Sequence, residues 1–302
     1  MLITVVIPTF RRPSDLRRCL DALAEQSRGA DEVLVVSRPE DRDGIAVAQC
    51  ASNKLPLRRV EVDRPGLVHA LQVGLDSARG DVVAFTDDDS VARSDWLERI
   101  ESHFDSSPRI VGVGGRDWVH ELGTTLNGSN EDVGRLTWYG RMIGNHHLGV
   151  GVARDVDALK GVNMAYRRGP LLELGFDRRL RGQGAQVANE IAVGLPLRKA
   201  GWRLVYDPLV AVDHFPSVRT AGDHRQRPRA RELSDAAFNE ALPILEYLPL
   251  PQRPLFLFWA ILVGTRRYFG LAQAIRFTPK LGLSAWAQFV ATASGRIAAT
   301  KG

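Results

Sequence analysis

The feature that most constrains this chain is a short apolar run, Val82–Phe85, that leads into three consecutive carboxylates, Asp87, Asp88 and Asp89. The run follows a turn pair, Arg79-Gly80, and predicts a short, fully buried strand. In open parallel sheets ligands bind beyond the carboxyl ends of the strands, and adjacent acids there repel one another unless a cation neutralises them. Hard oxygen ligands in this position suit Mg²⁺ or Mn²⁺.

A simpler interpretation of the triplet is a solvated acidic turn that caps a following helix, which the sequence favours over residues 90–100. An acidic triplet on its own more often has that structural role. The choice between a cap and a metal site therefore depends on the rest of the chain.

The composition is that of an ordinary globular protein. Its 302 residues are 44% hydrophobic and 25% charged, and they allow one large domain or two. Two cysteines, Cys19 and Cys50, exclude a disulfide framework and a cysteine zinc site and fit a reducing cytosol. The chain opens on an uncharged strand pattern and not on a signal peptide, so we expect a cytoplasmic location.

The first third of the chain alternates apolar runs with amphipathic segments. The predicted strands cover residues 2–7, 32–36, 58–62 and 81–85, and the predicted helices cover 13–26, 45–52 and 67–78. Such alternation indicates right-handed βαβ units and a parallel sheet. Residues 112–161 predict strands and long loops that form one wall of a pocket. Regular structure is expected again over 161–167, 170–174, 189–200 and 203–206.

Five short motifs occur in an order typical of one enzyme family. They are VVIPTFRRP at 5–13, FTDDD at 85–89, GVNMAYRR at 161–168, NE at 189–190 with LRKAGW at 197–202, and DH at 213–214. With these motifs the chain resembles the family 2 glycosyltransferases, inverting enzymes of the GT-A type that use a nucleotide-diphosphate sugar and a divalent metal. The resemblance covers residues 1–216.

The resemblance implies an α/β fold of the Rossmann-like GT-A type, in which helices flank a mostly parallel central sheet. We predict a catalytic domain over residues 1–218, with a nucleotide-sugar half over 1–110 and an acceptor half over 111–218. Residues 219–302 are expected to form a basic and apolar helical C-terminal extension.

The resemblance also implies a donor site at the carboxyl edge of the sheet. Asp87 and Asp89 match the D-x-D motif that binds Mn²⁺ or Mg²⁺ at the donor diphosphate, and His214 matches a late histidine that approaches the metal. Asp88 is expected to be a spacer or a supporting partner, because alternate residues of an extended chain point to opposite sides. The residues assigned to donor binding are Pro8, Thr9, Phe10, Arg11, Arg38, Asp41, Gly66, Asp87 and Asp88.

On the acceptor side, Glu190 falls where the family has the second acid of a Glu-Asp pair, the general base that deprotonates the acceptor hydroxyl. An inverting displacement needs such a base on the face opposite the leaving group, together with charge stabilisation of the departing diphosphate. The residues assigned to the sugar and acceptor pocket are Gly115, Arg116, Gly161, Asn163 and Asn189.

These residues also have structural interpretations. Glu190 suits the first turn of a helix capped by Asn189, where the macrodipole favours an acid. His214 alone would be a hydrogen-bonded histidine at a strand end, and Asn163 alone a turn residue. Pro196 lies in the helix that follows Glu190 and is expected to kink it or to end it early.

The chain departs from the family pattern near the expected nucleotide. Ser37 stands where members commonly carry an Asp that reads the base, so Arg38 or Asp41 would have to replace it, and the base stays open. Leu71 and Gln72 replace an Arg and an Asn in the helix after the Pro-Gly turn. These changes predict a divergent subgroup that keeps the chemically indispensable acids.

The C-terminal region has a composition of its own. Residues 247–302 carry seven basic residues and no acid, although the formal charge of the whole chain is only +5. The apolar run 255–264 is too short to span a bilayer as a helix. We hypothesise helices that dock on the inner face of the cytoplasmic membrane, near a lipid-linked acceptor. Packing on the catalytic domain, or a homo-oligomer interface, is an equal alternative.

A second basic cluster precedes this region. Its arginines could bind acceptor phosphates, although such a run is more often a solvated face; they are Arg225, Arg227, Arg229 and Arg231. No reader motif accompanies the basic residues, so nucleic acid is not an expected partner.

The predicted function is metal-dependent, inverting transfer of a sugar from a nucleotide-diphosphate sugar, with UDP favoured, to a sugar or lipid-linked acceptor in cell-surface polysaccharide or glycolipid synthesis. One alternative is a catalytically silent subunit that binds a nucleotide sugar or anchors a complex. Another is a sugar nucleotidyltransferase, which the lack of a Gly-rich, Lys-containing phosphate loop disfavours.

Overall fold

The computed structural model describes residues 1–121, 123–182, 184–216 and 230–302. The strands of the main sheet are β1 Ile3–Pro8, β2 Glu32–Ser37, β3 Leu57–Glu61, β4 Val82–Phe85, β5 Ser90–Ala92, β6 Ile110–Glu121, β7 Thr124–Thr125, β10 Arg154–Val156, β11 Met164–Arg167 and β12 Arg203–His214. A separate hairpin pairs β8 Arg135–Leu136 with β9 Met142–Ile143. The α-helices are α1 Pro13–Ala24, α2 Arg42–Ala51, α3 Leu67–Ser77, α4 Trp96–Ser106, α5 Arg168–Leu174, α6 Asn189–Lys199, α7 Ala230–Tyr247, α8 Arg253–Leu262, α9 Leu271–Leu281 and α10 Leu283–Ala299.

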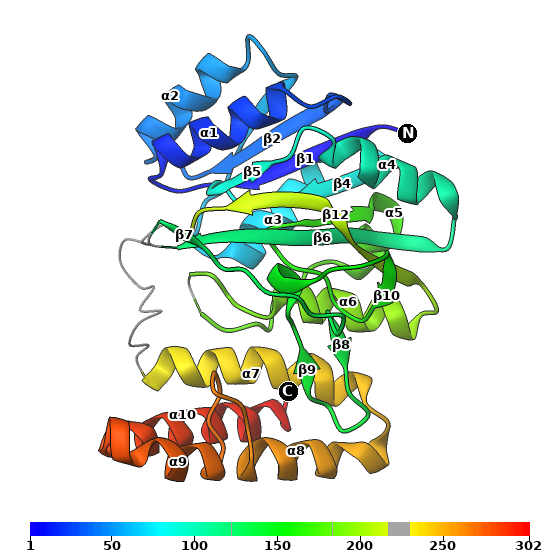
Figure 1. Ribbon diagram of the computed structural model, residues 1–302. Helices are drawn as coiled ribbons and strands as arrows, with labels where there is room; N and C mark the ends of the chain where they lie inside the picture. Colours follow the sequence, from blue (N-terminus) through cyan, green and yellow to red (C-terminus); the bar gives the residue numbers. More distant parts are fainter. Residues whose placement is uncertain (122, 183, 217–229) are drawn as a thin grey trace.

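The main sheet has the order β10-β12-β6-β11-β4-β1-β2-β3, with β5 beside β12 and β7 beside β6 (Figure 1). The pairs β1–β2, β2–β3, β1–β4 and β6–β12 are parallel, and β11 lies antiparallel between β4 and β6. The prediction of a mostly parallel α/β sheet of the GT-A type is thus confirmed. The four strands predicted in the first third lie within two residues of their expected ends.

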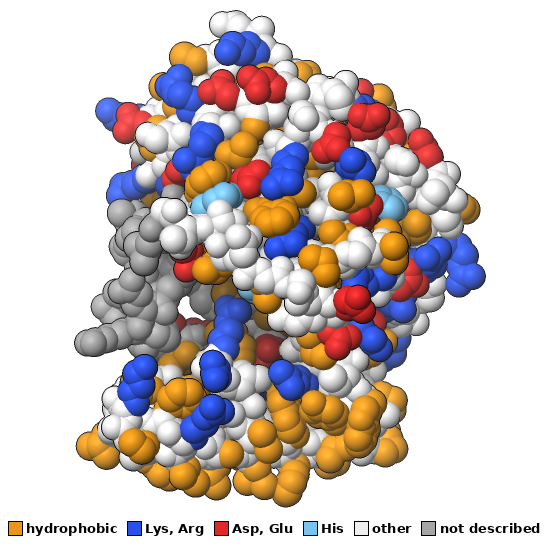
Figure 2. Space-filling view, viewed as in Figure 1, with side chains coloured by type: hydrophobic (Ala, Val, Ile, Leu, Met, Phe, Trp, Pro, Cys, Tyr) orange, Lys and Arg blue, Asp and Glu red, His pale blue; other side chains and the backbone are white. Residues whose placement is uncertain are grey.

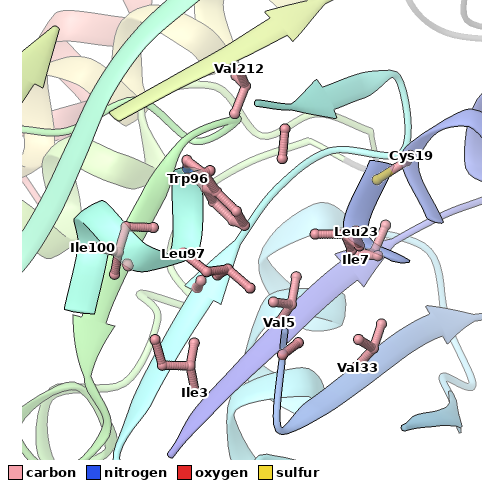
Figure 3. Close-up of a cluster of buried hydrophobic side chains, with 14 of the residues drawn as sticks. Ile3, Val5, Ile7, Cys19, Leu23, Val33, Trp96, Leu97, Ile100 and Val212 are labelled. Atoms are coloured by element: carbon pink, nitrogen blue, oxygen red, sulfur yellow. The ribbon is translucent and has the colours of Figure 1, made fainter. Parts of the chain in front are cut away.

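Helices cover both faces of this sheet because its central strands are apolar on both sides. On one face α1, α2 and α4 pack on residues such as Ile3, Val5 and Ile7 of β1, with Trp96 and Ile100 of α4 closing the cluster (Figure 3). On the other face α3, α5 and α6 pack on the alternate residues of the same strands. The result is a three-layer α/β/α domain, an arrangement in which ligands bind beyond the carboxyl ends of the strands.

The C-terminal helices add a further layer beyond α6. Ala188, Ile191 and Leu195 at and within α6 share one apolar core with Phe238 and Leu242 of α7, and α8 and α10 contribute to it. The predicted domain boundary at residue 218, together with Arg225, Arg227 and Arg229, lies outside the described residues. None of the helices within the described ranges is long and apolar enough to cross a membrane.

The structure corrects three local predictions. Residues 90–100 are not one helix, because Ser90–Ala92 form β5 and α4 begins only at Trp96. The strand predicted to end at residue 206 continues to His214 along β6. Of the two effects expected of Pro196, the early end of the helix is wrong: α6 continues to Lys199, since buried Leu195 and Leu197 hold it against its neighbours and outweigh the lost hydrogen bond.

Candidate active site

The acidic triplet meets the end of β12 through the short strand β5. Asp87 to Asp89 follow β4 directly, and β5 then runs antiparallel to β12 with Ser90 opposite His214. The backbone N–H of Phe215 donates to the carbonyl of Asp89 at 2.9 Å, which fixes this register. Residues about 125 positions apart in the chain are therefore brought together at the carboxyl edge of the sheet.

Asp87, Asp89 and His214 form a cluster suited to a cation. Each offers one ligand-type atom, and these three atoms lie within 4.8 Å of one another. His214 Nε2 lies 3.4 Å from Asp89 Oδ1, and His214 Nδ1 lies 3.9 Å from Asp117 Oδ2. Burial disfavours the imidazolium, but the neighbouring carboxylates of Asp117 and Asp89 raise the pKa of His214 to about 9. Without a metal, His214 is therefore protonated at neutral pH and balances the acids.

Asp117 of β6 is a further acid at this site that the sequence analysis missed. The parallel pairing of β6 with β12 sets it opposite Val212, where it is almost fully buried. Burial opposes its ionisation, but the adjacent imidazole of His214 and the charges of Lys160 and His146 hold the pKa of Asp117 below its usual range. No motif marks Asp117, because only strand pairing brings it beside His214.

Arg12 is the second residue that the sequence analysis missed. Its Nη1 donates to Asp88 Oδ1 at 2.8 Å and to Asp89 Oδ2 at 3.2 Å. The hydroxyl of Thr9 donates to the other oxygen of Asp88 at 2.8 Å. Burial raises the pKa of Asp88 to about 7, against the opposing charge of Arg12. Asp88 thus connects the acidic triplet to the segment after β1 through Thr9 and Arg12, and it supports the site in this way. The signal for Arg12 was its place in the first motif, directly before Pro13.

Aromatic and basic side chains gather where β1 and β2 end. Pro8 is the last residue of β1, and the backbone N–H of Thr9 donates to Val36 of β2 at 2.9 Å. The guanidinium of Arg38 lies 3.4 Å from the centre of the Phe10 ring, and that of Arg11 lies 5.0 Å from it. This stack offers a flat, cationic surface of the kind that receives a nucleobase or a phosphate.

Asp41 and Ser37 are less accessible than these residues. The carboxylate of Asp41 is buried and caps α2, where it accepts from the backbone N–H groups of Arg11 at 2.9 Å and Gly44 at 3.2 Å. The hydroxyl of Ser37 is also buried and makes no hydrogen bond with the described residues. Arg38 and Asp41 were the two residues expected to read the base in place of Ser37. Asp41 is used to cap α2, which leaves Arg38 as the candidate.

Gly66 precedes α3 with a φ of 128°, a backbone conformation that side chains rarely adopt. Leu71 of α3 belongs to the core. Gln72 accepts from the backbone N–H of Phe176 at 2.7 Å and therefore ties α3 to the segment after α5. Leu71 and Gln72, the two residues of α3 that depart from the family pattern, thus have structural roles.

Glu190 lies in the first turn of α6, behind a strained connection. Gln186 and Ala188 have φ values of 39° and 70°, in the left-handed region. The sequence suggested Asn189 as the N-cap of this helix, but the N-cap is Ala188. The left-handed turn places Asn189 inside the helix, where its Nδ2 donates back to the Gln186 carbonyl at 3.2 Å. Asn189 is buried, and its Oδ1 makes no hydrogen bond with the described residues.

The charge of Glu190 acts on groups from both the sheet and the C-terminal helices. Burial and the charge of Glu190 raise the pKa of Tyr166 in β11. Arg267 follows α8, and its pKa is raised mainly by the charge of Tyr268 and to a smaller extent by the charge of Glu190. Burial lowers the pKa of His146, which the charges of both Asp117 and Glu190 oppose. His146 is thus influenced by the charges of both Asp117 and Glu190, and Arg267 of the C-terminal helices by the charge of Glu190.

The segment before α6 is fastened to the C-terminal extension. Asn239 of α7 is buried, and it accepts from the backbone N–H of Arg181 at 2.7 Å and donates to the Arg181 carbonyl at 3.0 Å. The Arg181 guanidinium also lies 3.7 Å from the centre of the Phe238 ring. α7 therefore helps to position the turn that presents Glu190.

Two polar residues assigned to the sugar pocket serve the interior. The amide of Asn163 is fully buried, accepts from Trp96 Nε1 at 2.9 Å and donates to the Val210 carbonyl at 2.8 Å. The guanidinium of Arg116 is also buried; it donates to backbone carbonyls between residues 128 and 149 and stacks on Trp118 at 3.6 Å. A direct contact of either side chain with a sugar would require these bonds to break.

The two glycines assigned to the sugar pocket differ from each other. At Gly115 an added Cβ would overlap the backbone of Val210, so this glycine permits the close approach of β6 and β12. At Gly161 an added Cβ would meet no atom within 4 Å, so the space beside it is open.

A sheet of this order with acids after its central strand defines an α/β protein of the GT-A type. The chain belongs to the family described as glycosyltransferase like family 2, whose model matches residues 2–232. Among relatives it is 34% identical over 114 residues to the amylovoran biosynthesis glycosyltransferase AmsE of Erwinia amylovora, an alignment that covers 36% of this chain and 43% of that protein. It is 27% identical over 157 residues to a glucosyl-dolichyl phosphate glucuronosyltransferase of Haloferax volcanii, covering 49% of this chain and 47% of that protein. The chain thus spans less than half the length of these two relatives.

Solved structures confirm the fold. TarS of S. aureus, residues 1–349, is 17% identical with a TM-score of 0.65, and the match covers 99% of this chain and 81% of that structure. The mannosyltransferase PcManGT of Pyrobaculum calidifontis, in complex with GDP-Man and Mn²⁺, is 19% identical with a TM-score of 0.57, covering 98% of this chain and 86% of that structure. At these identities the likeness concerns the fold alone.

Proposed function

We propose that this protein transfers a sugar from a nucleotide-diphosphate sugar to an acceptor hydroxyl, with inversion and with the help of a divalent metal. The observation that carries the proposal is the convergence of Asp87, Asp89 and His214 beyond β4, in a chain of this family. Structures of the same fold are known in complex with UDP-GlcNAc and with GDP-Man and Mn²⁺, which supports a nucleotide-sugar donor.

The residues present fit Mn²⁺ or Mg²⁺. Two carboxylates and an imidazole offer hard oxygen and nitrogen ligands, and their ligand atoms are close enough to converge on one ion. When bound, the ion would neutralise charge that develops on the departing diphosphate. His214 would have to release its proton in order to bind the metal. Arg12 forms an ion pair with Asp88, and this pair does not depend on the metal.

On the acceptor side Glu190 is the proposed general base. Its carboxylate would accept the proton of the acceptor hydroxyl while that oxygen forms a bond to the anomeric carbon. The bond from the anomeric carbon to the diphosphate breaks, and its electron pair leaves with the nucleoside diphosphate. The position supports this role, because Glu190 is partly exposed while Asn189 before it and Ile191 after it are buried.

We further propose that Phe10 and Arg38 receive the nucleobase, since they form the accessible stack at the ends of β1 and β2. A UDP-sugar remains the favoured donor, but related folds bind both UDP-GlcNAc and GDP-Man, so the test must include several bases. The proposed acceptor is a sugar or lipid-linked hydroxyl in the synthesis of a surface polysaccharide or glycolipid. In support, one relative is an amylovoran biosynthesis glycosyltransferase and the other a glucosyl-dolichyl phosphate glucuronosyltransferase.

Donor turnover tests this proposal. The purified protein is incubated with UDP-, GDP- and dTDP-sugars and Mn²⁺, and the released products are separated by chromatography. We expect slow release of one nucleoside diphosphate, which EDTA stops. Release of pyrophosphate would instead indicate a nucleotidyltransferase. No turnover of any donor, with a nucleotide still bound, would indicate a silent binding subunit.

A further inference from the structure

The C-terminal helices expose an unusual amount of apolar surface. Of the seventeen large hydrophobic residues that are exposed within the described ranges, eleven lie between Leu250 and Ile297. The most exposed of them are Leu283 at 87%, Leu250 at 72%, Phe258 at 64% and Val290 at 62%. Figure 2 shows hydrophobic side chains along the lower edge of the molecule, over α8, α9 and α10. We call this surface, formed by the exposed apolar residues of 250–297, the apolar face.

Helix α10 has the reverse of the pattern found in a helix that covers a water-soluble core. One large side chain, Arg296, is buried on its inner side, where the guanidinium donates to backbone carbonyls of residues 260, 268 and 269. The other buried residues of α10 are small, such as Ala291 and Gly295, and an added Cβ at Gly295 would overlap the backbone of Ser234 in α7. Its large residues Leu283, Val290 and Ile297, spaced by seven, point outward. Small residues inside and large apolar residues outside are typical of helices whose outer side faces lipid.

Basic residues border the apolar face. From residue 247 to residue 302 the chain has no Asp or Glu, and Arg266, Arg276 and Lys280 have exposed side chains. Figure 2 shows Lys and Arg side chains on the helices just above the apolar lower edge. A basic border around an apolar surface is complementary to anionic headgroups around acyl chains.

We propose that the apolar face docks on an anionic membrane surface, with α8, α9 and α10 lying in the interface. The helices are too short to cross a bilayer, so the contact is peripheral. A second copy of the chain fits less well, because a two-fold contact brings the same surface against itself and would set basic border against basic border with no acid between them. This inference goes beyond the proposed sugar chemistry and stands without it.

Vesicle flotation of the full chain tests the proposal. We expect binding to phosphatidylcholine vesicles that contain phosphatidylglycerol, and weak binding to phosphatidylcholine alone. The double variant L283S/V290S, on the outer side of α10, should lose at least about ten-fold in affinity. The variants R276Q and K280Q should each lose roughly five-fold, and salt should weaken binding of the wild type.

The matched control is V152S/L209S, which removes two exposed apolar residues from the catalytic domain and should bind like the wild type. Light scattering without lipid provides the second measurement. The proposal is overturned if the wild type binds neither vesicle, if the control loses as much affinity as L283S/V290S, or if the wild type is a dimer that L283S/V290S converts to monomers. Donor turnover by L283S/V290S should equal that of the wild type, so loss of docking and loss of catalysis are distinguishable.

Discussion

The donor side and the acceptor side of the candidate site are built differently. On the donor side Asp88, Asp89 and His214 are buried at the edge of the sheet and are held by ion pairs with Arg12 and Asp117. On the acceptor side Glu190 is partly exposed and follows a left-handed turn that a helix outside the sheet helps to hold. The difference teaches that the proposed diphosphate site is held by the sheet and by Arg12 before α1, whereas the proposed acceptor base also depends on the C-terminal helices.

The largest effect should come from the acceptor base. Glu190→Gln keeps the shape of the side chain but removes the proton acceptor, so we expect kcat to fall by about 10³-fold. Affinity for the nucleoside diphosphate should stay unchanged, because the donor side is intact. Steady-state kinetics and calorimetry measure the two quantities. Glu173→Gln, at an exposed position on α5, is the control; an equal loss of kcat there would refute the assignment.

Arg12→Ala tests how firmly the donor side is held. It leaves buried Asp88 without its ion pair, which should lower the free energy of unfolding by about 3 kcal/mol. Urea denaturation measures this, and Arg17→Ala, exposed on the same helix, should cost almost nothing. If the two variants were equally stable, the Arg12–Asp88 pair would not support the site.

The metal-free donor site should lose stability as the pH rises. The pKa of His214 is raised to about 9 in the folded protein, from about 6.5 in the unfolded chain. Its stabilising contribution is therefore complete below pH 6.5 and disappears as the pH rises through 9. The loss is on the order of 3 kcal/mol.

Thermal unfolding in EDTA between pH 6.5 and 9.5 measures this dependence. His214→Gln should flatten the part of the curve between pH 7.5 and 9, while Asp88, whose pKa is about 7, titrates mainly below that window. An unchanged slope in the variant would mean that His214 does not balance the acids.

The smallest effect should come from the link between α7 and the turn before α6. Asn239→Ala removes both hydrogen bonds to the backbone of Arg181 and should cost about 2 kcal/mol of stability. Because the turn positions Glu190, kcat should also fall by roughly ten-fold, with nucleotide affinity unchanged. Asn53→Ala, at an exposed position, serves as the control. A lower nucleotide affinity in Asn239→Ala would contradict the separation of the two sides.

Local sequence patterns predicted the parts of the fold that local chemistry determines. The apolar strands and amphipathic helices of the first third lie close to their predicted positions, and the D-x-D acids lie at a strand end as expected. β5 was missed because three residues become a strand only through pairing with β12. Asp117 was missed for the same reason.

The remaining errors have a tertiary origin too. The strain at Ala188 and the continuation of α6 through Pro196 depend on packing that no local pattern shows. The composition of the C-terminal region indicated basic, apolar helices, but only the structure shows that the large apolar residues of α10 face outward. The sequence shows which types of residue a helix contains. Which of its sides faces the solvent depends on how the helix packs in the folded protein.

The central claim is that the Asp-His cluster binds a metal–diphosphate unit. The most direct test is thermal stabilisation by UDP, GDP, dTDP, CDP and ADP, each with Mn²⁺ and with EDTA, on the wild type and on Asp89→Ala. We predict that one nucleotide raises Tm only with Mn²⁺ and that Asp89→Ala abolishes the rise. A rise that persists in EDTA or in Asp89→Ala, or the lack of a rise with every nucleotide, would contradict the account.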